Sequence, residues 1–405
     1  MPSPYDALVS DPGPLGNPFE GMPFLGDLVR MFGQQGGTAW DSARQLAVTV
    51  ATGGVSEDNV DPVERIQIEQ LARVADLRVA DATGLSTSVS GRSVSVRPVN
   101  RTTWVTESLE AYRPLVERLA EALGPPEVPV DEPAEPGDPF GGMFAGMLHM
   151  LQPMVLAMTA GSMVGHLGQR TFGQYDLPIP RPISGPGADE LMLVVPNLDA
   201  FAGEWSLPSD DLRLWICVHE VAHHAVLGVP HVRARLDDLL TRYVSSFRND
   251  ASALEDRLGH LDLADPSALA QLQDVLGSPD VILGAITSPE QDAIRPHLEG
   301  LVAVVVGVVD HVLDQLGTTL MPSYGMLTEA LRRRRVEAAE ADRFVERLFG
   351  LELSQATYDR GATFVRGVLE RAGDDGLRRL WDGEEHLPTP PEVDAPGLWL
   401  ARIDL

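Results

Sequence analysis

Two residue types are missing or nearly missing from this chain of 405 residues. There is no lysine, because all 31 basic residues are arginines. This absence excludes a Schiff-base lysine, a phosphate-loop lysine and a Ser-Lys catalytic dyad. The single cysteine, Cys217, excludes an intrachain disulfide and a cysteine-rich metal site. A chain without disulfides is typical of a reducing compartment, so we expect a cytoplasmic protein.

Positive charge is also scarce. The 31 arginines face 59 acidic residues, which gives a formal net charge of −28. A surface this acidic repels phosphate backbones, so we expect no nucleic-acid partner. Hydrophobic residues make up 44% of the chain, enough for a sizeable core. The best internal boundary by composition is the acidic, proline-rich stretch 125–138, which separates an N-terminal helical part, 1–124, from a second helical part, 139–405.

One uncharged stretch, 139–169, is long enough to span a bilayer. It holds six of the twelve methionines, and it is interrupted by polar residues and proline, among them His149, Gln152 and Pro153. Methionine fills irregular gaps in protein cores, so a buried helix is the better interpretation. We expect no stable membrane insertion.

The hydrophobic pattern predicts a mainly α fold with a few short β-strands near the motif helix described below. Weak alternation over 85–105 indicates a short hairpin or edge strands, and 190–196 indicates a strand. The tail 387–405 is predicted to be extended. The first expected helix, 61–82, has Asp61 as N-cap and Ile66, Val74 and Leu77 on its apolar face. The other expected helices are 107–123, 210–227, 231–247, 265–275, 289–316, 325–348 and 354–371.

The chemically informative helix is the one predicted over 210–227. Ser209 can serve as its N-cap, and Asp210 and Asp211 favour its first turn through the helix dipole. Gly228 followed by Pro230 favours its end. The residues between these signals therefore lie in the middle of a helix.

His219, Glu220 and His223 form an H-E-x-x-H sequence there, the signature of zinc hydrolases. Residues four apart share a helix face, so the two imidazoles emerge one turn apart and can hold one zinc ion per chain. Glu220 is placed to take a proton from the attacking water, whose pKa a metal lowers toward ~7, and to pass it to the leaving group. The competing interpretation is a pair of core histidines that are satisfied by hydrogen bonds. Cys217 and His224 point elsewhere on the helix and are expected to be structural.

A third protein ligand is required at a catalytic zinc site. His231 is close in sequence, but it follows Pro230 and begins the next helix. Glu299 is the preferred candidate, because it lies at the edge of an apolar helix whose start is marked by a capping box at Ser288. Gly300 would let that helix approach the motif helix. The alternative is an ion pair of Glu299 with Arg295, and the outside candidates for the ligand are His297, His311 and Glu329.

The sequence resembles the zincin-like metallopeptidases over most of its length. The residues that carry the resemblance are 17–26, 173–176, 195–197, 215–223, Val229-Pro230, Glu299-Gly300, 348–351 and 396–402. The resemblance implies a mostly helical, single compact unit over 1–405 in which His219 and His223 bind zinc and Glu220 is the base. A glutamate third ligand is what glutamate-type zincins suggest for Glu299. The chain departs from their E-x-x-x-D pattern, since position 303 is Ala303.

These observations predict a zinc-dependent hydrolase, most simply a metallopeptidase acting on a peptide or protein. Strand 190–196 would bind the extended substrate along its edge. The alternative is a non-catalytic, zinc-stabilised helical scaffold that binds a protein partner and closes its site with His219, His223, Glu299 and His231.

Some further residues have candidate roles at the zinc site. Asp310 could orient a ligand histidine, and Tyr324, Tyr358 and His311 are candidates for stabilising an oxyanion. The run 332–335 of four arginines is interpreted as a solvated, salt-bridged face, with a substrate carboxylate as the alternative partner.

Overall fold

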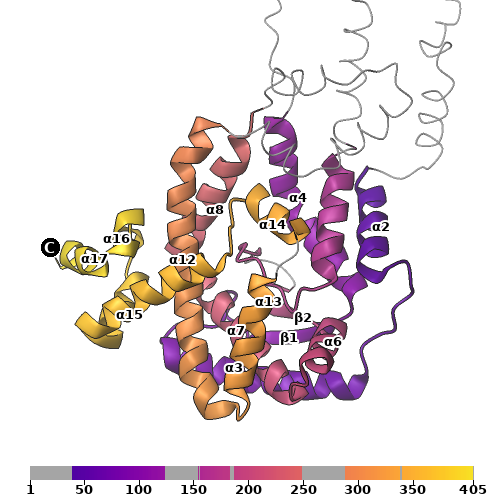
Figure 1. Cartoon of the computed structure of the whole chain (residues 1–405), viewed down its shortest axis with the longest axis horizontal. Helices are drawn as coiled ribbons and strands as arrows, with labels where there is room; N and C mark the ends of the chain where they lie inside the picture. The colour runs from indigo at the N-terminus through magenta and orange to yellow at the C-terminus, as the bar shows by residue number, and fades with distance from the viewer. Residues whose placement is uncertain are drawn as a thin grey trace, which may run out of the picture.

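The computed structural model describes residues 39–123, 154, 156–182, 187–248, 288–337 and 340–404. It is mainly helical, as the sequence predicts (Figure 1). The boundary expected at 125–138 and the helix expected at 265–275 lie outside the described residues. The helices are α2 (Ala39–Thr52), α3 (Pro62–Thr83), α4 (Arg101–Ala122), α6 (Val195–Trp205), α7 (Ser209–Gly228), α8 (Pro230–Ser245), α12 (Pro289–Leu320), α13 (Tyr324–Val336), α14 (Glu340–Leu348), α15 (Gln355–Arg378), α16 (Pro390–Asp394) and α17 (Pro396–Ile403), with 3-10 turns η1 (Arg379–Trp381) and η2 (Glu384–His386).

Two short strands form the sheet of the described part. Strands β1 (Ser95–Val99) and β2 (Glu190–Val194) pair in parallel, with Ser95 opposite Glu190 and Val99 opposite Val194. The strand expected over 190–196 is confirmed, except that α6 begins already at Val195. Of the two alternatives expected over 85–105, the hairpin is wrong, because β1 pairs with a strand about a hundred residues away, and the edge strand is present as β1.

Helix α12 is the longest in the described part and lies against α7, α8 and α15 (Figure 1). Its capping box, Ser288 with Gln291, is present as predicted. Close packing on α15 depends on glycine, since a Cβ at Gly361 would lie 2.0 Å from the carbonyl oxygen of Ala303. The expectation for Gly300 is wrong: its nearest neighbours are Pro390 and Val393, so it faces α16 and not the motif helix.

By length and composition, α12 is also the one helix in the described ranges that could cross a membrane, and most of its apolar stretch is buried inside the molecule. A core helix of a protein outside the membrane can have the same length and apolar composition. In the methionine-rich stretch, residues 156–168 are helical and bury Ala157, Ala160 and Met163. Apart from residues 154 and 169, the remainder of that stretch lies outside the described residues.

Helix α3 has the predicted N-cap, with Asp61 accepting a hydrogen bond from the backbone N–H of Val63 at 2.7 Å. Its predicted apolar face is wrong, since Ile66 is 55% and Leu77 68% exposed. The buried face carries mostly small residues, with alanines at 72 and 75 between Ile68 and Val79. Small side chains let α3 lie close to α7. The face of α3 that is buried is therefore the one that allows the two helices to approach, not the one with the largest hydrophobic side chains.

Two further expectations differ from the structure near the C-terminus. The helix expected over 325–348 is two helices, α13 and α14. The tail expected to be extended forms α16 and α17, and the buried Trp399 donates from Nε1 to the carbonyl oxygen of His386 at 2.6 Å. A proline at the first turn of each short helix fits a helix start as well as an extended tail.

Candidate active site

The motif helix α7 is buried over most of its length. It ends at Gly228 and is followed by Pro230 at the start of α8, as predicted. The N-cap differs from the prediction, because Ser209 is already helical and the cap residue is Pro208, which provides no side-chain hydrogen bond. Asp211 instead ties this end to the start of α13 by accepting from the backbone N–H of Ser323 at 2.9 Å and from its hydroxyl at 2.5 Å. Those contacts set the position of the helix start.

The rings of His219 and His223 lie side by side, with centroids 4.3 Å apart and planes inclined by 53°. Trp215, one turn earlier, stacks on His219 at 5.2 Å. Nδ1 of His223 is 3.1 Å from the carbonyl oxygen of His219, and Nδ1 of His219 is 3.0 Å from Oε1 of Glu220. The Nε2 atoms of both rings make no hydrogen bond to the residues that the structure describes. Two nitrogen donors thus remain available on one face of α7.

Both imidazoles are held in the neutral form. Burial, against the opposing effect of Asp176 and with the help of the positive charges of Arg335 and Arg334, lowers the pKa of His219 to about 4. Burial and the neighbouring His219 lower the pKa of His223 well below its usual value. A neutral imidazole is the form that binds a metal ion.

Glu220 is fully buried beneath the segment 173–175. Its Oε2 accepts the backbone N–H groups of Gln174 at 2.7 Å and Tyr175 at 2.9 Å. Burial, reinforced by the negative charge of Asp176, raises the pKa of Glu220 to about 8 in spite of these donors. The sequence predicts a carboxylate that faces the catalytic water; the structure shows one that is packed under a loop, with Oε1 on the His219 side.

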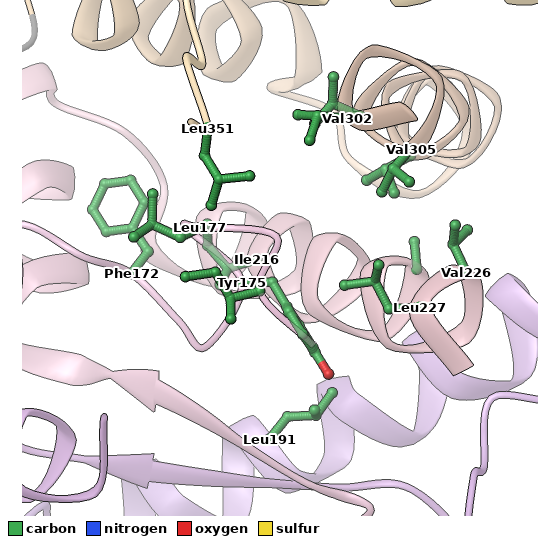
Figure 2. Close-up of a cluster of buried hydrophobic side chains, with 14 of the residues drawn as sticks. Phe172, Tyr175, Leu177, Leu191, Ile216, Val226, Leu227, Val302, Val305 and Leu351 are labelled. Atoms are coloured by element: carbon green, nitrogen blue, oxygen red, sulfur yellow. The ribbon is translucent and has the colours of Figure 1, made fainter. Parts of the chain in front are cut away.

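The segment over Glu220 is itself fixed by hydrogen bonds. The carbonyl oxygen of Gly173 accepts from Nε1 of Trp104 at 2.8 Å, and the Tyr175 hydroxyl meets Nδ1 of His224 at 3.0 Å. Tyr175 lies between α7 and β2, with its hydroxyl toward Leu191 (Figure 2). His224 is therefore structural, as expected from the sequence.

Strand β2 does not offer a free edge for a peptide. One side pairs with β1, and Leu193 on β2 also forms an antiparallel bridge with Gly173. Residues 191–194 are all buried. The expectation that this strand binds an extended substrate is wrong, because both of its edges are already used inside the molecule.

A cavity of about 500 Å³ opens beside His219. Its wall includes Trp215 on α7, Asp176 after the loop, Arg334 and Arg335 on α13 and Tyr358 on α15. Of the three candidates for oxyanion stabilisation, only Tyr358 lines this cavity. Elsewhere, Tyr324 donates to Asp314, and Nε2 of His311 is 3.0 Å from Nε2 of Gln315.

Asp176 is the site residue that sequence reasoning missed. It accepts the backbone N–H of Phe172 at 3.2 Å and forms an ion pair with Arg334 at 3.4 Å. Its negative charge acts on His219, Glu220 and His223. The signal in the sequence is its place in the segment 173–176, one of the segments that resemble the zincin-like family.

Glu299 lies in another, smaller pocket, of about 140 Å³, together with Tyr243 and Arg295. Burial and the nearby charge of Glu352 raise its pKa. Arg295 forms its ion pair with Asp292 at 3.4 Å, so the alternative pairing with Glu299 is not the one observed. The structure therefore does not bring Glu299 into the cavity beside the histidine pair, and its role as a ligand stays a prediction.

The other residues predicted to bind the metal or to orient a ligand have contacts away from the histidine pair. Nε2 of His231 is 2.9 Å from the carbonyl oxygen of Leu380, and Asp310 forms an ion pair with Arg335 at 3.6 Å. Glu329 pairs with Arg332 and Arg333 on the surface, and His297 borders a separate small pocket. Among the described residues, no three His, Cys, Asp or Glu side chains are arranged as a metal-binding group.

Comparison with known proteins adds the family. The model of the family described as zincin-like metallopeptidase matches residues 39–400 of the chain. The chain belongs to the zincin-like metallopeptidases. A solved structure from Chloroflexus aurantiacus, described as a proposed hydrolase with a novel fold, is similar at a TM-score of 0.61 and 24% identity, covering 90% of this chain and 98% of that one. That likeness establishes a shared fold, and the comparison with curated proteins gives no match. For a zincin-like metallopeptidase, the pair of histidines on α7 is the expected centre of the site.

Proposed function

We propose that this zincin-like metallopeptidase is a zinc-dependent hydrolase that cleaves a peptide or protein, with its metal held by His219 and His223. The observation that carries the proposal is the pair of neighbouring rings whose Nε2 atoms lack a hydrogen-bond partner among the described residues. Both imidazoles are neutral, and His219 borders a cavity large enough for a ligand. Such a donor set fits zinc.

For the third ligand we propose Asp176 in place of Glu299. Asp176 shares the cavity wall with His219, whereas Glu299 lines a different pocket. With its side chain turned toward the histidine pair, Asp176 would complete the set of two histidines and one acidic ligand found in many zinc hydrolases; in the structure the three side chains are not grouped around one point. Its contact with Arg334 is long, at 3.4 Å, so the carboxylate can exchange this partner for a cation.

Glu220 has two tasks in this proposal. Its Oε1 accepts the Nδ1 proton of His219, which leaves the lone pair on Nε2 for the metal. As general base, the carboxylate receives the proton of the attacking water and later delivers it to the leaving amine, which requires Oε1 to turn from His219 toward the cavity. Zinc, when bound, supplies Lewis acidity toward the water and the scissile carbonyl. The two backbone N–H groups on Oε2 keep the carboxylate in place during these transfers.

The alternative of a closed, non-catalytic zinc site has less support. It needs His231 and Glu299 on the same ion as the histidine pair. His231 is bound to the Leu380 carbonyl, and Glu299 lies in another pocket.

The decisive experiment combines metal analysis with turnover. Purified full-length chain should bind one zinc ion, and His219→Ala and His223→Ala should lose it, while His231→Ala should retain it. Glu220→Gln should lower peptide cleavage by about 10²–10⁴-fold. A parent protein that takes up no zinc when zinc is supplied, or a Glu220→Gln variant that cleaves as fast as the parent, would overturn the proposal.

A further inference from the structure

The cavity beside His219 has a charge opposite to that of the whole molecule. Its wall carries three carboxylates, Asp176, Glu346 and Glu352. The same wall carries five arginines: Arg170, Arg334, Arg335, Arg343 and Arg347. An excess of two positive charges is thus gathered in the cavity of a chain whose formal net charge is −28. A concave wall with one sign of charge concentrates ligands of the opposite sign.

We infer that this cavity binds a carboxylate group of the substrate, and that Arg335 is the side chain that receives it. The inference rests on the proposed hydrolase function and adds a substrate class, peptides with a carboxylate next to the scissile region. It also revises the interpretation of the arginine run 332–335. Only Arg332 and Arg333 form the surface ion pairs expected there, both with Glu329.

Arg334 and Arg335 differ in how they are held. Arg334 donates to the carbonyl oxygen of Arg170, pairs with Asp176, and lies 3.7 Å from the ring centre of Phe172. Arg335 lies 3.8 Å from the ring centre of Tyr358, and its closest polar contact with a described residue is the ion pair with Asp310 at 3.6 Å. The contact with the Tyr358 ring supports the Arg335 guanidinium from one side, and the long ion pair leaves N–H donors for a planar carboxylate.

The position of Arg335 links the cavity to the chemistry. Arg335 and His219 line the same cavity, so a group bound by Arg335 lies in the space beside the histidine pair. The cavity volume, about 500 Å³, falls within the range of about 300–1,000 Å³ typical of small-molecule pockets. The three carboxylates in the wall disfavour a multiply charged anion and favour a singly charged one.

Two further atoms mark this wall as a binding surface. Nε1 of Trp215 and Oε1 of Gln355 are buried and have no hydrogen-bond partner among the described residues. Both residues line the cavity. Buried polar atoms without partners are uncommon in native proteins, so the wall has hydrogen-bonding capacity that a ligand can use once side chains adjust.

The test uses three versions of one peptide and the zinc-loaded full-length protein. The first has an amidated C-terminus and a central Gln, the second a free C-terminal carboxylate, and the third an amidated end with Glu in place of the Gln. Binding is measured by calorimetry at low temperature, with peptide integrity checked by mass spectrometry. We expect one of the charged peptides to bind at least about tenfold more tightly than the neutral one. If the second peptide binds more tightly than the neutral one, the recognised carboxylate is the C-terminus; if the third does, the carboxylate is on a side chain.

Substitutions on helix α13 then test the role of Arg335. Arg335→Gln should reduce the preference to less than about twofold, while Arg332→Gln, an exposed control on the same helix, should retain it. If Arg335→Gln fails to fold, Arg335→Lys retains a partner for Asp310 and should keep only part of the preference. Zinc content measured on the same samples separates this test from the proposed function. Equal binding of all three peptides, or a preference that survives in Arg335→Gln, would refute the inference.

Discussion

Gly173 lies directly against the carboxylate of Glu220. A Cβ added at Gly173 would stand 2.4 Å from Cδ and 2.5 Å from Oε1 of Glu220, closer than real side-chain contacts allow. The H-E-x-x-H motif is therefore in direct contact with a segment far from it in sequence. The loop can donate two N–H groups to Glu220 only because position 173 has no side chain.

The first prediction follows from this contact. Gly173→Ala should displace either the loop or Glu220, lowering the free energy of unfolding by about 1–3 kcal/mol and removing hydrolase activity. Gly325→Ala is the control, because a Cβ there meets nothing within 4 Å. Urea denaturation and peptide cleavage measure the two effects. A Gly173→Ala variant with the parent's stability and activity would show that the loop does not hold Glu220 as described.

The second prediction separates the two candidates for the third zinc ligand. Asp176→Asn should weaken zinc binding by more than the 10- to 100-fold that changes outside the ligand set cause. Glu299→Gln should leave zinc affinity unchanged, because Glu299 lines the pocket with Tyr243 and Arg295. Competition with a fluorescent chelator measures both affinities. The opposite result, with zinc lost only in Glu299→Gln, would restore the assignment suggested by the family resemblance.

Local signals in the sequence were sufficient for the motif helix and the histidine pair. The spacing of His219 and His223 sets their common face, and Gly228 and Pro230 mark the helix end, because each depends on residues within one or two turns. The capping box of α12 was predictable for the same reason.

Relations between distant segments were not predictable in this way. The parallel pairing of β1 with β2, and the placement of residues 173–176 over Glu220, join segments that no periodicity links. The prediction of Glu299 as a ligand depends on the need of a carboxylate on an apolar helix for a partner, which does not say where that helix lies. The predicted apolar face of α3 is wrong because the buried face carries alanines at a close helix contact, while larger apolar side chains stay exposed.

The third prediction concerns the contact between α12 and α15. A Cβ at Gly361 would lie 2.0 Å from the carbonyl oxygen of Ala303, so Gly361→Ala should push the helices apart and lower stability by about 1–3 kcal/mol. Because Tyr358 lies one turn earlier on α15, the same variant should also weaken peptide binding in the cavity. Gly203→Ala on α6 is the control, since its Cβ would meet nothing within 4 Å. Thermal unfolding that is identical for both variants would contradict the close packing.

The fourth prediction is a dependence of stability on pH that originates at Asp189. The side chain is buried and accepts hydrogen bonds from the backbone N–H groups of Val89 at 2.7 Å and Ser90 at 3.0 Å. It also receives the hydroxyl of Ser90 and lies 3.2 Å from Nε2 of His224. Burial alone would raise the pKa of Asp189, but these donors outweigh it and lower the pKa from 3.8 to about 2.

A carboxyl group whose pKa is lower in the folded state stabilises the protein above its unfolded pKa and loses that effect as the pH falls toward the folded value. Asp189 should therefore contribute about 2 kcal/mol at pH 7, and this contribution should disappear between about pH 4 and pH 2. Other carboxylates titrate in the same range, so the informative quantity is the difference in unfolding free energy between the parent and Asp189→Asn. That difference should be largest at neutral pH and shrink through the acidic range; a difference that stays constant down to pH 2 would show that the hydrogen bonds around Asp189 do not favour its ionised form.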